Sequence, residues 1–512
     1  MKDYLKDNRH LFVLAIVNFL FIFASSFVKG YEYFIDEFYY IACANHPAMG
    51  YVDHPPFAPL LLMIYKFVFG ESLYAVRFLP AVASSMTVFL SGIIAKHMGG
   101  NKLSQTIAAF AVFTSPIFLT FGSFYSMNVL EPMLTAMGIL FLIRMINDDN
   151  PKFLMHFGII AGLMLMNKHT SALFILFVFA MMMFTGYRRF LFTKYSVYGI
   201  LLMGLIFIPN IIWQVQNDFP SLEFYMTNIA EKNVKISVKE YFLMLIFGYN
   251  PFVLLICFCG TAYFLITKRF AKYRLSALVF LAAFIFFFVF RTGRIDRPAF
   301  AFIVIIPAGA IFIENIVSRI KQKWIIPLLG ILSMACMLTV IPLLMPFLSY
   351  ENTERLTNFL GLNTEMEKGK KPKVPQMISD RIGWKEKTEM LGQVYMLMTE
   401  DERRNTIIVA DYYGIAGAIE LYGKKYWIEE VVCTHNNYFL WSKERLKGNV
   451  MLKLTKKSSY MELKEAFNMV DTTSVFYDNE YCSPEGREQT VFICRSPKHS
   501  KEEMLEEGKN FY

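Results

Sequence analysis

About eleven long apolar stretches determine what this chain can fold into. A helix that spans a bilayer needs about 20 largely apolar residues, and these stretches are near that length with almost no charge at their centres. Only 18% of the 512 residues are charged, against about a quarter in soluble proteins. The sequence therefore predicts a mainly α-helical, polytopic membrane protein with about 11 transmembrane helices. These are expected near residues 11–29, 75–95, 103–121, 128–146, 153–167, 170–187, 195–213, 241–267, 275–290, 298–317 and 325–348.

Basic residues in the short connections indicate the orientation, because cytoplasmic loops carry an excess of Lys and Arg. The apolar run 11–29 is too long for the core of a cleaved signal, so we expect it to be the first transmembrane helix. With the N-terminus inside, every inner connection is basic, and an odd helix count places the C-terminal region outside. The inner cations are Lys2, Lys6, Arg9, Lys96, Lys102, Arg144, Lys152, Arg188, Arg189, Lys194, Lys268, Arg269, Lys272, Arg274, Arg319, Lys321 and Lys323. These loops account for the net charge of +9, so no nucleic-acid partner is expected.

Two outer connections break this charge rule. The segment "FRTGRIDRPAF" carries Arg291, Arg294 and Arg297, and "MNKHTS" carries Lys168 and His169. One explanation is ion pairing with Asp296 and other outer acids. The alternative is an anionic ligand at the outer interface, since Arg offers a planar fork that binds phosphate through two hydrogen bonds.

The first outer loop, residues 30–74, gathers acids and aromatic rings. "IDEFYY" contains Asp36 and Glu37, followed by Tyr39 and Tyr40. A carboxylate at this position could act as a general base or as a ligand of Mg²⁺ or Mn²⁺. The simpler interpretation is a solvated acidic pair beside the aromatic belt found at membrane interfaces.

Further along, "YVDHPP" holds Asp53 and His54 before two prolines, which stiffen the backbone. The turn leads into the short apolar segment 55–69, which we expect to be an amphipathic helix on the membrane surface. Glu131 lies at the outer end of the fourth predicted helix, as a candidate second carboxylate. Carboxylates and cations on one face could cleave a sugar–phosphate bond, the base taking a proton while cations stabilise the departing phosphate.

Residues 350–512 are far more polar than residues 1–349, which form the predicted transmembrane domain. A helical segment, "WKEKTEMLGQVYMLMTEDERR", precedes three strand-like runs, "NTIIVA", "GNVMLKL" and "QTVFICR". This alternation predicts a small soluble α/β domain outside the cytoplasm. No CxxC motif occurs, so a cysteine-based zinc or redox site is not expected. A disulfide between Cys482 and Cys494 is left open.

The first-loop motifs resemble those of membrane glycosyltransferases with the C-type fold, grouped as glycosyltransferase family 39. That family includes protein O-mannosyltransferases and bacterial lipid A aminoarabinose transferases. Its D-E-x-Y-Y and G-Y-x-D-H-P-P patterns are matched here by residues 36–40 and 50–56. The tail segments "DYYGIAGAIELYG" and "THNNYFLW" also resemble bacterial members.

The resemblance implies a polyprenyl-phosphate sugar donor, transfer with inversion, and Asp36 as the catalytic base supported by Glu37. Glu131 corresponds to an acid that is Asp in many relatives. Substrate contacts are expected from Tyr39, Tyr40, Asp53, His54, Lys168, His169, Arg291, Arg294 and Arg297. Metal use varies in the family; an Mg or Mn ion, if bound, would be held by Asp36, Glu37 and Glu131.

The same resemblance implies a bacterial cytoplasmic (inner) membrane location. The acceptor could be lipid A, another glycolipid, a glycan or a protein hydroxyl, and the sequence does not identify it or the sugar. No P-loop or GxGxxG phosphate cradle occurs, so a donor that carries its own activated bond suits the outer face. The alternative function is a transporter or flippase for a lipid-linked or anionic substrate. Such proteins place ionisable groups near the membrane midplane, whereas here charges gather at the outer helix ends. A scaffold is a third class.

Overall fold

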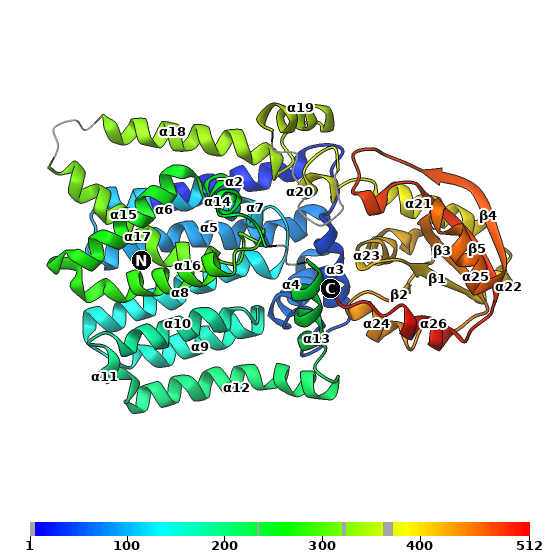
Figure 1. Ribbon diagram of the computed structural model, residues 1–512, viewed down its shortest axis with the longest axis horizontal. Helices are drawn as coiled ribbons and strands as arrows, with labels where there is room; N and C mark the ends of the chain where they lie inside the picture. Colours follow the sequence, from blue (N-terminus) through cyan, green and yellow to red (C-terminus); the bar gives the residue numbers. More distant parts are fainter. Residues whose placement is uncertain (1–5, 233–234, 320–323, 362–371) are drawn as a thin grey trace.

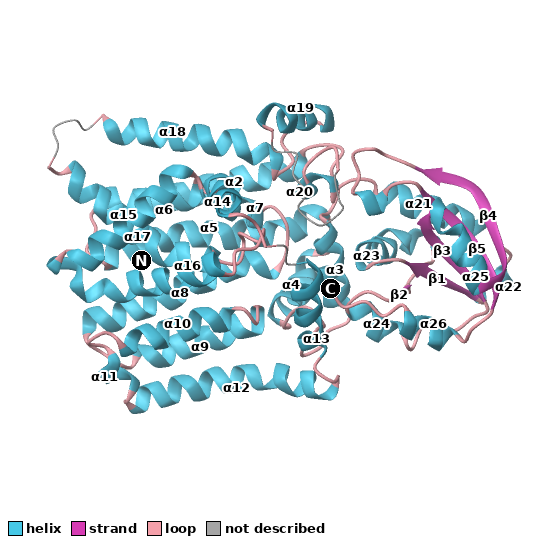
Figure 2. Ribbon diagram, in the orientation of Figure 1, coloured by secondary structure: helices cyan, strands magenta, loops and turns pink. Residues whose placement is uncertain are grey.

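A computed structural model describes residues 6–232, 235–319, 324–361 and 372–512. Within these ranges, seven helices are long and apolar enough to cross a membrane. They are α2 (Arg9–Ala24, extended by a 3-10 turn to Phe27), α5 (Leu73–His97), α8 (Met127–Asp148), α12 (Lys194–Gln216), α16 (Arg274–Val289, preceded by the 3-10 helix Lys268–Tyr273), α17 (Ala299–Val317) and α18 (Ile325–Val340, extended by the 3-10 turn Ile341–Leu343). Figure 2 shows that helices dominate the chain, as predicted.

Two further spans are bent helix pairs. α6 (Lys102–Phe113) and α7 (Pro116–Gly122) meet at 65°, and α14 (Val238–Tyr249) and α15 (Pro251–Ile266) meet at 103°. Each second helix begins with proline, which has no backbone N–H and cannot continue the preceding helix. Counting these pairs gives up to nine spans among the described residues.

The remaining two predicted ranges form shorter apolar helices, α9 (Phe153–Asn167) and α10 (Ser171–Met183). All eleven predicted ranges therefore coincide with helices, and eleven as the number of complete spans stays a prediction. A four-residue helix, α11 (Arg188–Leu191), connects α10 to α12. Figure 1 shows α9, α10 and α12 side by side with the rest of the bundle.

Several predicted inner connections meet at one end of the bundle. Lys96 forms an ion pair with Asp7, and the side chain of Asn147 donates to the carbonyl of His97 at 2.6 Å. The hydroxyl of Tyr273 donates to the side-chain oxygen of Asn147 at 2.6 Å. Four connections that the charge rule placed together are therefore joined. The predicted inner cations Lys2, Lys321 and Lys323 lie outside the described residues.

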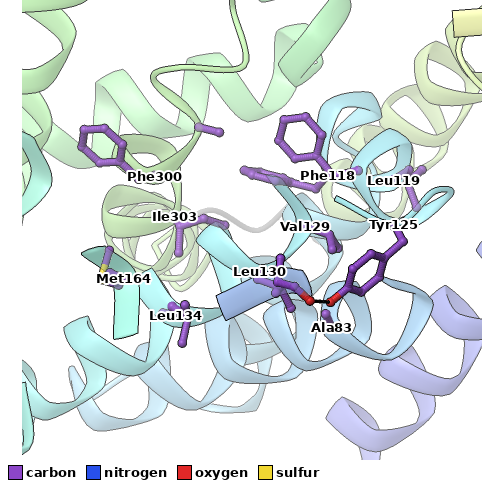
Figure 3. Close-up of a cluster of buried hydrophobic side chains, with 14 of the residues drawn as sticks. Ala83, Phe118, Leu119, Tyr125, Val129, Leu130, Leu134, Met164, Phe300 and Ile303 are labelled. Carbon is purple, nitrogen blue, oxygen red and sulfur yellow. Dashed lines mark hydrogen bonds between the residues drawn. The ribbon is translucent and has the colours of Figure 1, made fainter. Parts of the chain in front are cut away.

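The core of the bundle forms around α17, whose residues 299–311 are all buried. A helix that is apolar on every face belongs in the interior. Figure 3 shows Phe300 and Ile303 of α17 near Leu130 and Leu134 of α8, with Phe118 of α7 alongside. This packing fixes the N-terminal ends of α8 and α17, which border the candidate site described below.

Three short helices lie between the bundle and the C-terminal sheet: α3 (Ile35–Asn45), α4 (Phe57–Phe69) and α13 (Pro220–Thr227) (Figure 1). α4 exposes Ile64, Phe67, Val68 and Phe69. An apolar face left uncovered at one end of the bundle is what a helix on a membrane surface requires.

The C-terminal region contains one five-stranded mixed sheet of order β2-β1-β3-β5-β4. β1 (Thr406–Ala410) is parallel to β2 (Val432–Cys433) and β3 (Val450–Lys456), while β5 (Gln489–Pro497) is antiparallel to β3 and β4 (Phe467–Tyr477). Figure 2 shows helices packed beside this sheet, as an α/β domain requires. The helices near the sheet are α21 (Trp384–Leu397), α22 (Glu400–Arg404), α23 (Tyr413–Tyr422), α24 (Asn437–Ser442), α25 (Tyr460–Ala466) and α26 (Lys501–Glu507). Two further helices of this region, α19 (Tyr350–Leu360) and α20 (Gln376–Ser379), lie beside the bundle and apart from the sheet (Figure 1).

The structure corrects the sequence-based account of this region in two places and answers one question that the sequence left open. The helix predicted over 384–404 is broken, because Thr399 caps a new helix. β2 and β4 were not predicted; β4 is a largely exposed edge strand and lacks the apolar alternation of a buried one. The Cys482–Cys494 disulfide that the sequence left open is not formed in the structure: both thiols are free, and the Cys482 thiol donates to the carbonyl of Ile382 at 3.2 Å.

Candidate active site

The acidic pair of the first outer loop lies in the first turn of α3. Carboxylates are stabilised there by the partial positive charge of a helix N-terminus. Successive residues of a helix point about 100° apart, so the two acids face different surroundings. Asp36 is partly exposed, whereas Glu37 is fully buried.

The Glu37 carboxylate is held on all sides by the protein. Arg77 of α5, itself only 1% exposed, forms an ion pair with it at 3.1 Å. Backbone N–H groups of Phe34 and Tyr125 donate to its two oxygens at 2.8 and 3.1 Å. Through these partners Glu37 connects α3 to α5 and to the residues just before α8. Because its oxygens are already bound by the protein, Glu37 is better suited to position α3 than to contact a substrate.

Asp36 faces the C-terminal region instead. The hydroxyl of Tyr413, the first residue of α23, donates to its Oδ1 atom at 3.0 Å. The ring of Tyr413 lies 4.9 Å from the ring of Tyr39. Asp36 is thus the acid of the pair that is near the boundary between the first loop and the C-terminal domain.

Asp53 is connected to α3 through Tyr39, whose hydroxyl donates to the Asp53 Oδ1 atom at 2.7 Å. The side chain of Asn437 accepts a hydrogen bond from the Val52 N–H at 3.2 Å, while the Asn437 N–H donates to the Tyr39 hydroxyl at 3.3 Å. Both tail segments that resemble glycosyltransferases therefore contact the first-loop motifs.

His54 is completely buried and stacks on Tyr40, with ring centroids 4.7 Å apart. Its Nδ1 atom lies 2.9 Å from the carbonyl of Pro55, and its Nε2 atom lies 4.0 Å from the Asp53 carboxylate. The turn predicted from "YVDHPP" is present. It leaves the Asp53 carboxylate partly exposed beside Tyr39, whereas His54 is buried.

The second predicted carboxylate is paired with the predicted phosphate-binding lysine. The ammonium of Lys168, at the end of α9, donates to Glu131 Oε2 and to Asn128 Oδ1, each at 2.9 Å. Lys168 is 6% exposed and Glu131 is 2% exposed. A buried pair of this kind is costly to break, because the remaining charge would be uncompensated.

The arginine-rich loop is close enough to this pair for the charges of Asp296 and Lys168 to interact. Arg294 forms an ion pair with Asp296 at 3.2 Å. Although burial raises the pKa of Asp296, the positive charges of Arg294, Lys168 and Arg297 lower it to about 2. Asp296 is therefore ionised, and it belongs to the same group of charges as Lys168 and the two arginines.

His169 follows Lys168 and forms a short hydrogen-bonded chain. The Asn210 side chain donates through Nδ2 to the carbonyl of Met49 at 3.0 Å, so its oxygen accepts from His169 Nε2 at 3.0 Å. His169 Nδ1 then accepts from the Tyr225 hydroxyl at 3.2 Å. Burial lowers the pKa of His169, consistent with this neutral tautomer.

Tyr225 joins the acidic and basic halves of the site. Burial raises its pKa, the negative charges of Asp53 and Glu131 raise it further, and the positive charge of Arg297 opposes them. These charges act on Tyr225 because they are close to it. The first loop, the α8–α9 end and the arginine-rich loop therefore surround one polar region.

The structure brings together most of the predicted site residues. They are Asp36, Tyr39, Tyr40, Asp53, His54, Glu131, Lys168, His169, Arg294 and Arg297. Arg291 differs, because it donates to the carbonyl of Ile236 at 3.0 Å and lies over the ring of Phe288. The Arg294–Asp296 contact supports ion pairing as one reason for the misplaced cations, and it leaves room for an anionic ligand as the other.

Five residues of the site were not predicted: Arg77, Asn210, Tyr225, Tyr413 and Asn437. Tyr413 and Asn437 lie inside the two tail segments that carried the resemblance, so a signal for them existed. Asn210 was visible as a polar interruption after Pro209 in an apolar stretch. Nothing in the sequence distinguishes Arg77 or Tyr225 from ordinary residues at membrane boundaries.

Among the described residues, no three His, Cys, Asp or Glu side chains form a group that could hold a metal ion. Glu37 is bound by Arg77 and Glu131 by Lys168. Asp36, Glu37 and Glu131 therefore do not form a shared ligand set in this arrangement.

Residues 53–213 match the family model described as "Dolichyl-phosphate-mannose-protein mannosyltransferase". Over 94% of this chain, the structure matches that of ArnT from Cupriavidus metallidurans bound to undecaprenyl phosphate, with a TM-score of 0.61, 14% identity and 97% of that chain covered. The chain has the C-type glycosyltransferase fold. The resemblance seen in the first-loop motifs is thereby confirmed at the level of the fold.

Other C-type glycosyltransferases match less closely. The archaeal oligosaccharyltransferase AglB from Archaeoglobus fulgidus, in complex with an inhibitory peptide and a dolichol-phosphate, gives a TM-score of 0.53 at 11% identity, covering 99% of this chain and 78% of that chain. The arabinofuranosyltransferase AftD from Mycobacteria gives 0.51 at 12% identity, covering 96% and 40%. No curated protein sequence matches the chain.

Proposed function

We propose that this protein is an integral-membrane glycosyltransferase that moves a sugar from a polyprenyl-phosphate donor to a hydroxyl acceptor. The observation that carries the proposal is the placement of a carboxylate, Asp36, and three cations around one polar region at one end of the bundle. Of these cations Lys168 is buried, whereas Arg294 and Arg297 are more exposed. The match to a structure of ArnT with undecaprenyl phosphate supports the donor class.

The reaction is a single displacement with inversion at the anomeric carbon. Asp36 accepts the proton of the acceptor hydroxyl as its oxygen forms the new bond to that carbon. The bond from the anomeric carbon to the phosphate oxygen breaks, and its electron pair leaves on the polyprenyl phosphate. Lys168, Arg294 and Arg297 stabilise the negative charge of that leaving group.

The location follows from the same placement. The site lies opposite the basic connections that the charge rule assigns to the cytoplasm, so we place it on the outer face of the cytoplasmic membrane. Residues 1–349 form the transmembrane domain and residues 350–512 the extracytoplasmic domain of this proposal. The acceptor hydroxyl belongs to lipid A, another glycolipid, a glycan or a protein.

A direct test uses the purified protein in lipid vesicles with a polyprenyl-phosphate sugar labelled in the sugar. Transfer should release polyprenyl phosphate and place the label on an added acceptor, as followed by mass spectrometry. The protein would instead be a flippase if the labelled donor crossed the bilayer and no covalent product formed with any of the four acceptor classes. Polyprenyl phosphate copurifying with the protein would support the donor class independently.

Two arginines of one loop give a matched comparison for donor binding. Arg297→Ala should raise the dissociation constant of polyprenyl phosphate by about tenfold or more, because a charge-assisted hydrogen bond is worth about 1.5–3 kcal/mol. Arg291→Ala should have a smaller effect, because Arg291 binds the carbonyl of Ile236. Equal losses in the two variants, measured by lipid-binding titration, would contradict this assignment.

A further inference from the structure

The C-terminal domain lies directly on the helix that carries the acidic pair. α23 packs on α3 through two glycines. A Cβ atom on Gly414 would lie 2.4 Å from Ile35, and one on Gly417 would lie 2.9 Å from Phe38 and 3.0 Å from its backbone. A side chain at Gly417 would press on the backbone of α3, so no larger residue fits there unless the two helices move apart, and one at Gly414 would force the Ile35 side chain to shift. The close approach of the two helices is therefore built into the sequence of the domain.

This contact determines where Tyr413 lies. Because α23 begins at Tyr413, its docking on α3 places the phenol beside Asp36, with the hydroxyl 3.0 Å from Oδ1. Burial raises the pKa of Tyr413 well above its ordinary value, and the negative charge of Asp36 adds to this effect. Tyr413 therefore keeps its proton, and its hydroxyl donates a hydrogen bond to the carboxylate.

A second contact fixes the same boundary independently. Arg445 of the C-terminal domain donates to Nε2 of His46, at the end of α3, at 2.9 Å, and His46 stacks on Trp441. The same arginine forms a buried ion pair with Glu420 of α23 at 2.8 Å. Both ends of α3 are thus held by the domain, which makes the Tyr413–Asp36 contact a fixed part of the fold.

We propose that Tyr413 is a positioning residue for the catalytic base, and that the C-terminal domain thereby completes the active site. Its hydroxyl fixes the orientation of the Asp36 carboxylate and stabilises its charged form, which is the form that accepts a proton. This inference rests on the proposed function, and it assigns the domain a role in the reaction itself.

The test is Tyr413→Phe, which removes one oxygen and keeps the ring against Tyr39. The kcat/KM for sugar transfer should fall by about tenfold, the worth of a hydrogen bond to a charged group. The acidic limb of its pH profile should also move to higher pH by about one unit, because the charged carboxylate loses a donor. A loss of packing alone would lower activity without moving that limb.

Tyr412→Phe is the matched control, at the neighbouring position. The Tyr412 hydroxyl is buried without a hydrogen-bond partner among the described residues, so its removal should leave the limb in place. A limb that stays at the wild-type pH in Tyr413→Phe would overturn the inference. Full activity in Asp36→Asn would refute the proposed base instead, so the two failures are distinguishable. Thermal melts of all variants check that they fold.

Discussion

Asp36→Asn should lower kcat for sugar transfer by about 10²–10⁴, the usual contribution of a positioned general base. The amide has nearly the shape of the carboxylate and still accepts a hydrogen bond from Tyr413, so the fold should survive. It cannot take up the acceptor proton at neutral pH. The measurement is kcat at saturating donor in vesicles, with polyprenyl-phosphate binding determined in parallel.

Binding separates the base from the phosphate site. Donor affinity should stay within a few-fold of the wild-type value, because Lys168, Arg294 and Arg297 are unchanged. Asp148→Asn is the control for charge removal, since Asp148 is exposed and lies at the opposite end of α8 from Glu131. An Asp36→Asn variant with wild-type kcat would remove Asp36 from the chemistry.

The helices of the bundle could be predicted because a membrane-spanning helix has a simple sequence pattern. A run of apolar residues long enough to cross the bilayer forms a helix, since every backbone polar group must be satisfied internally. The bends were not predicted as bends, although Pro116 and Pro251 mark them. Hydropathy averages over a whole stretch and therefore hides a break of a few residues.

The part of the candidate site that was predicted rests on residues close together in the sequence and on misplaced charges, whereas the partners that were missed lie far along the chain. Asp36, Asp53 and His54 lie within one short loop with recognisable motifs, and cations on the outer side violated a charge rule. The partner of Asp36 is Tyr413, 377 positions later, and the partner of Glu37 is Arg77 on another helix. Such pairings follow from how helices pack, and neither pattern nor propensity in one sequence reveals them.

The pairing of the site's charges also bears on function. Lys168 faces Glu131 and Arg294 faces Asp296, so the cations are compensated by neighbouring acids. Lys168 is buried, and without Glu131 its charge would be strongly destabilising before any anion arrived. Ion pairing and anion binding, which the sequence presented as alternatives, are therefore compatible within one site.

The largest effect on stability is expected from Arg77→Met. This change leaves the fully buried Glu37 carboxylate without its cation, which should lower the free energy of unfolding by about 3–5 kcal/mol. The Phe34 and Tyr125 N–H groups still bind Glu37, so the loss reflects the charge. Unfolding in detergent, followed by circular dichroism, measures it.

The exposed ion pair of Arg189 and Asp149 provides the contrast. Both side chains are about 60% exposed, so Arg189→Met should cost far less, as is usual for surface pairs. The double variant Arg77→Met with Glu37→Gln should recover part of the loss, because a neutral amide keeps an acceptor for the backbone N–H groups. Equal stability of Arg77→Met and Arg189→Met would mean that the buried pair does not hold α3. If Arg77→Met is destabilised as expected, transfer should fall with it, since Asp36 lies on the same helical turn as Glu37.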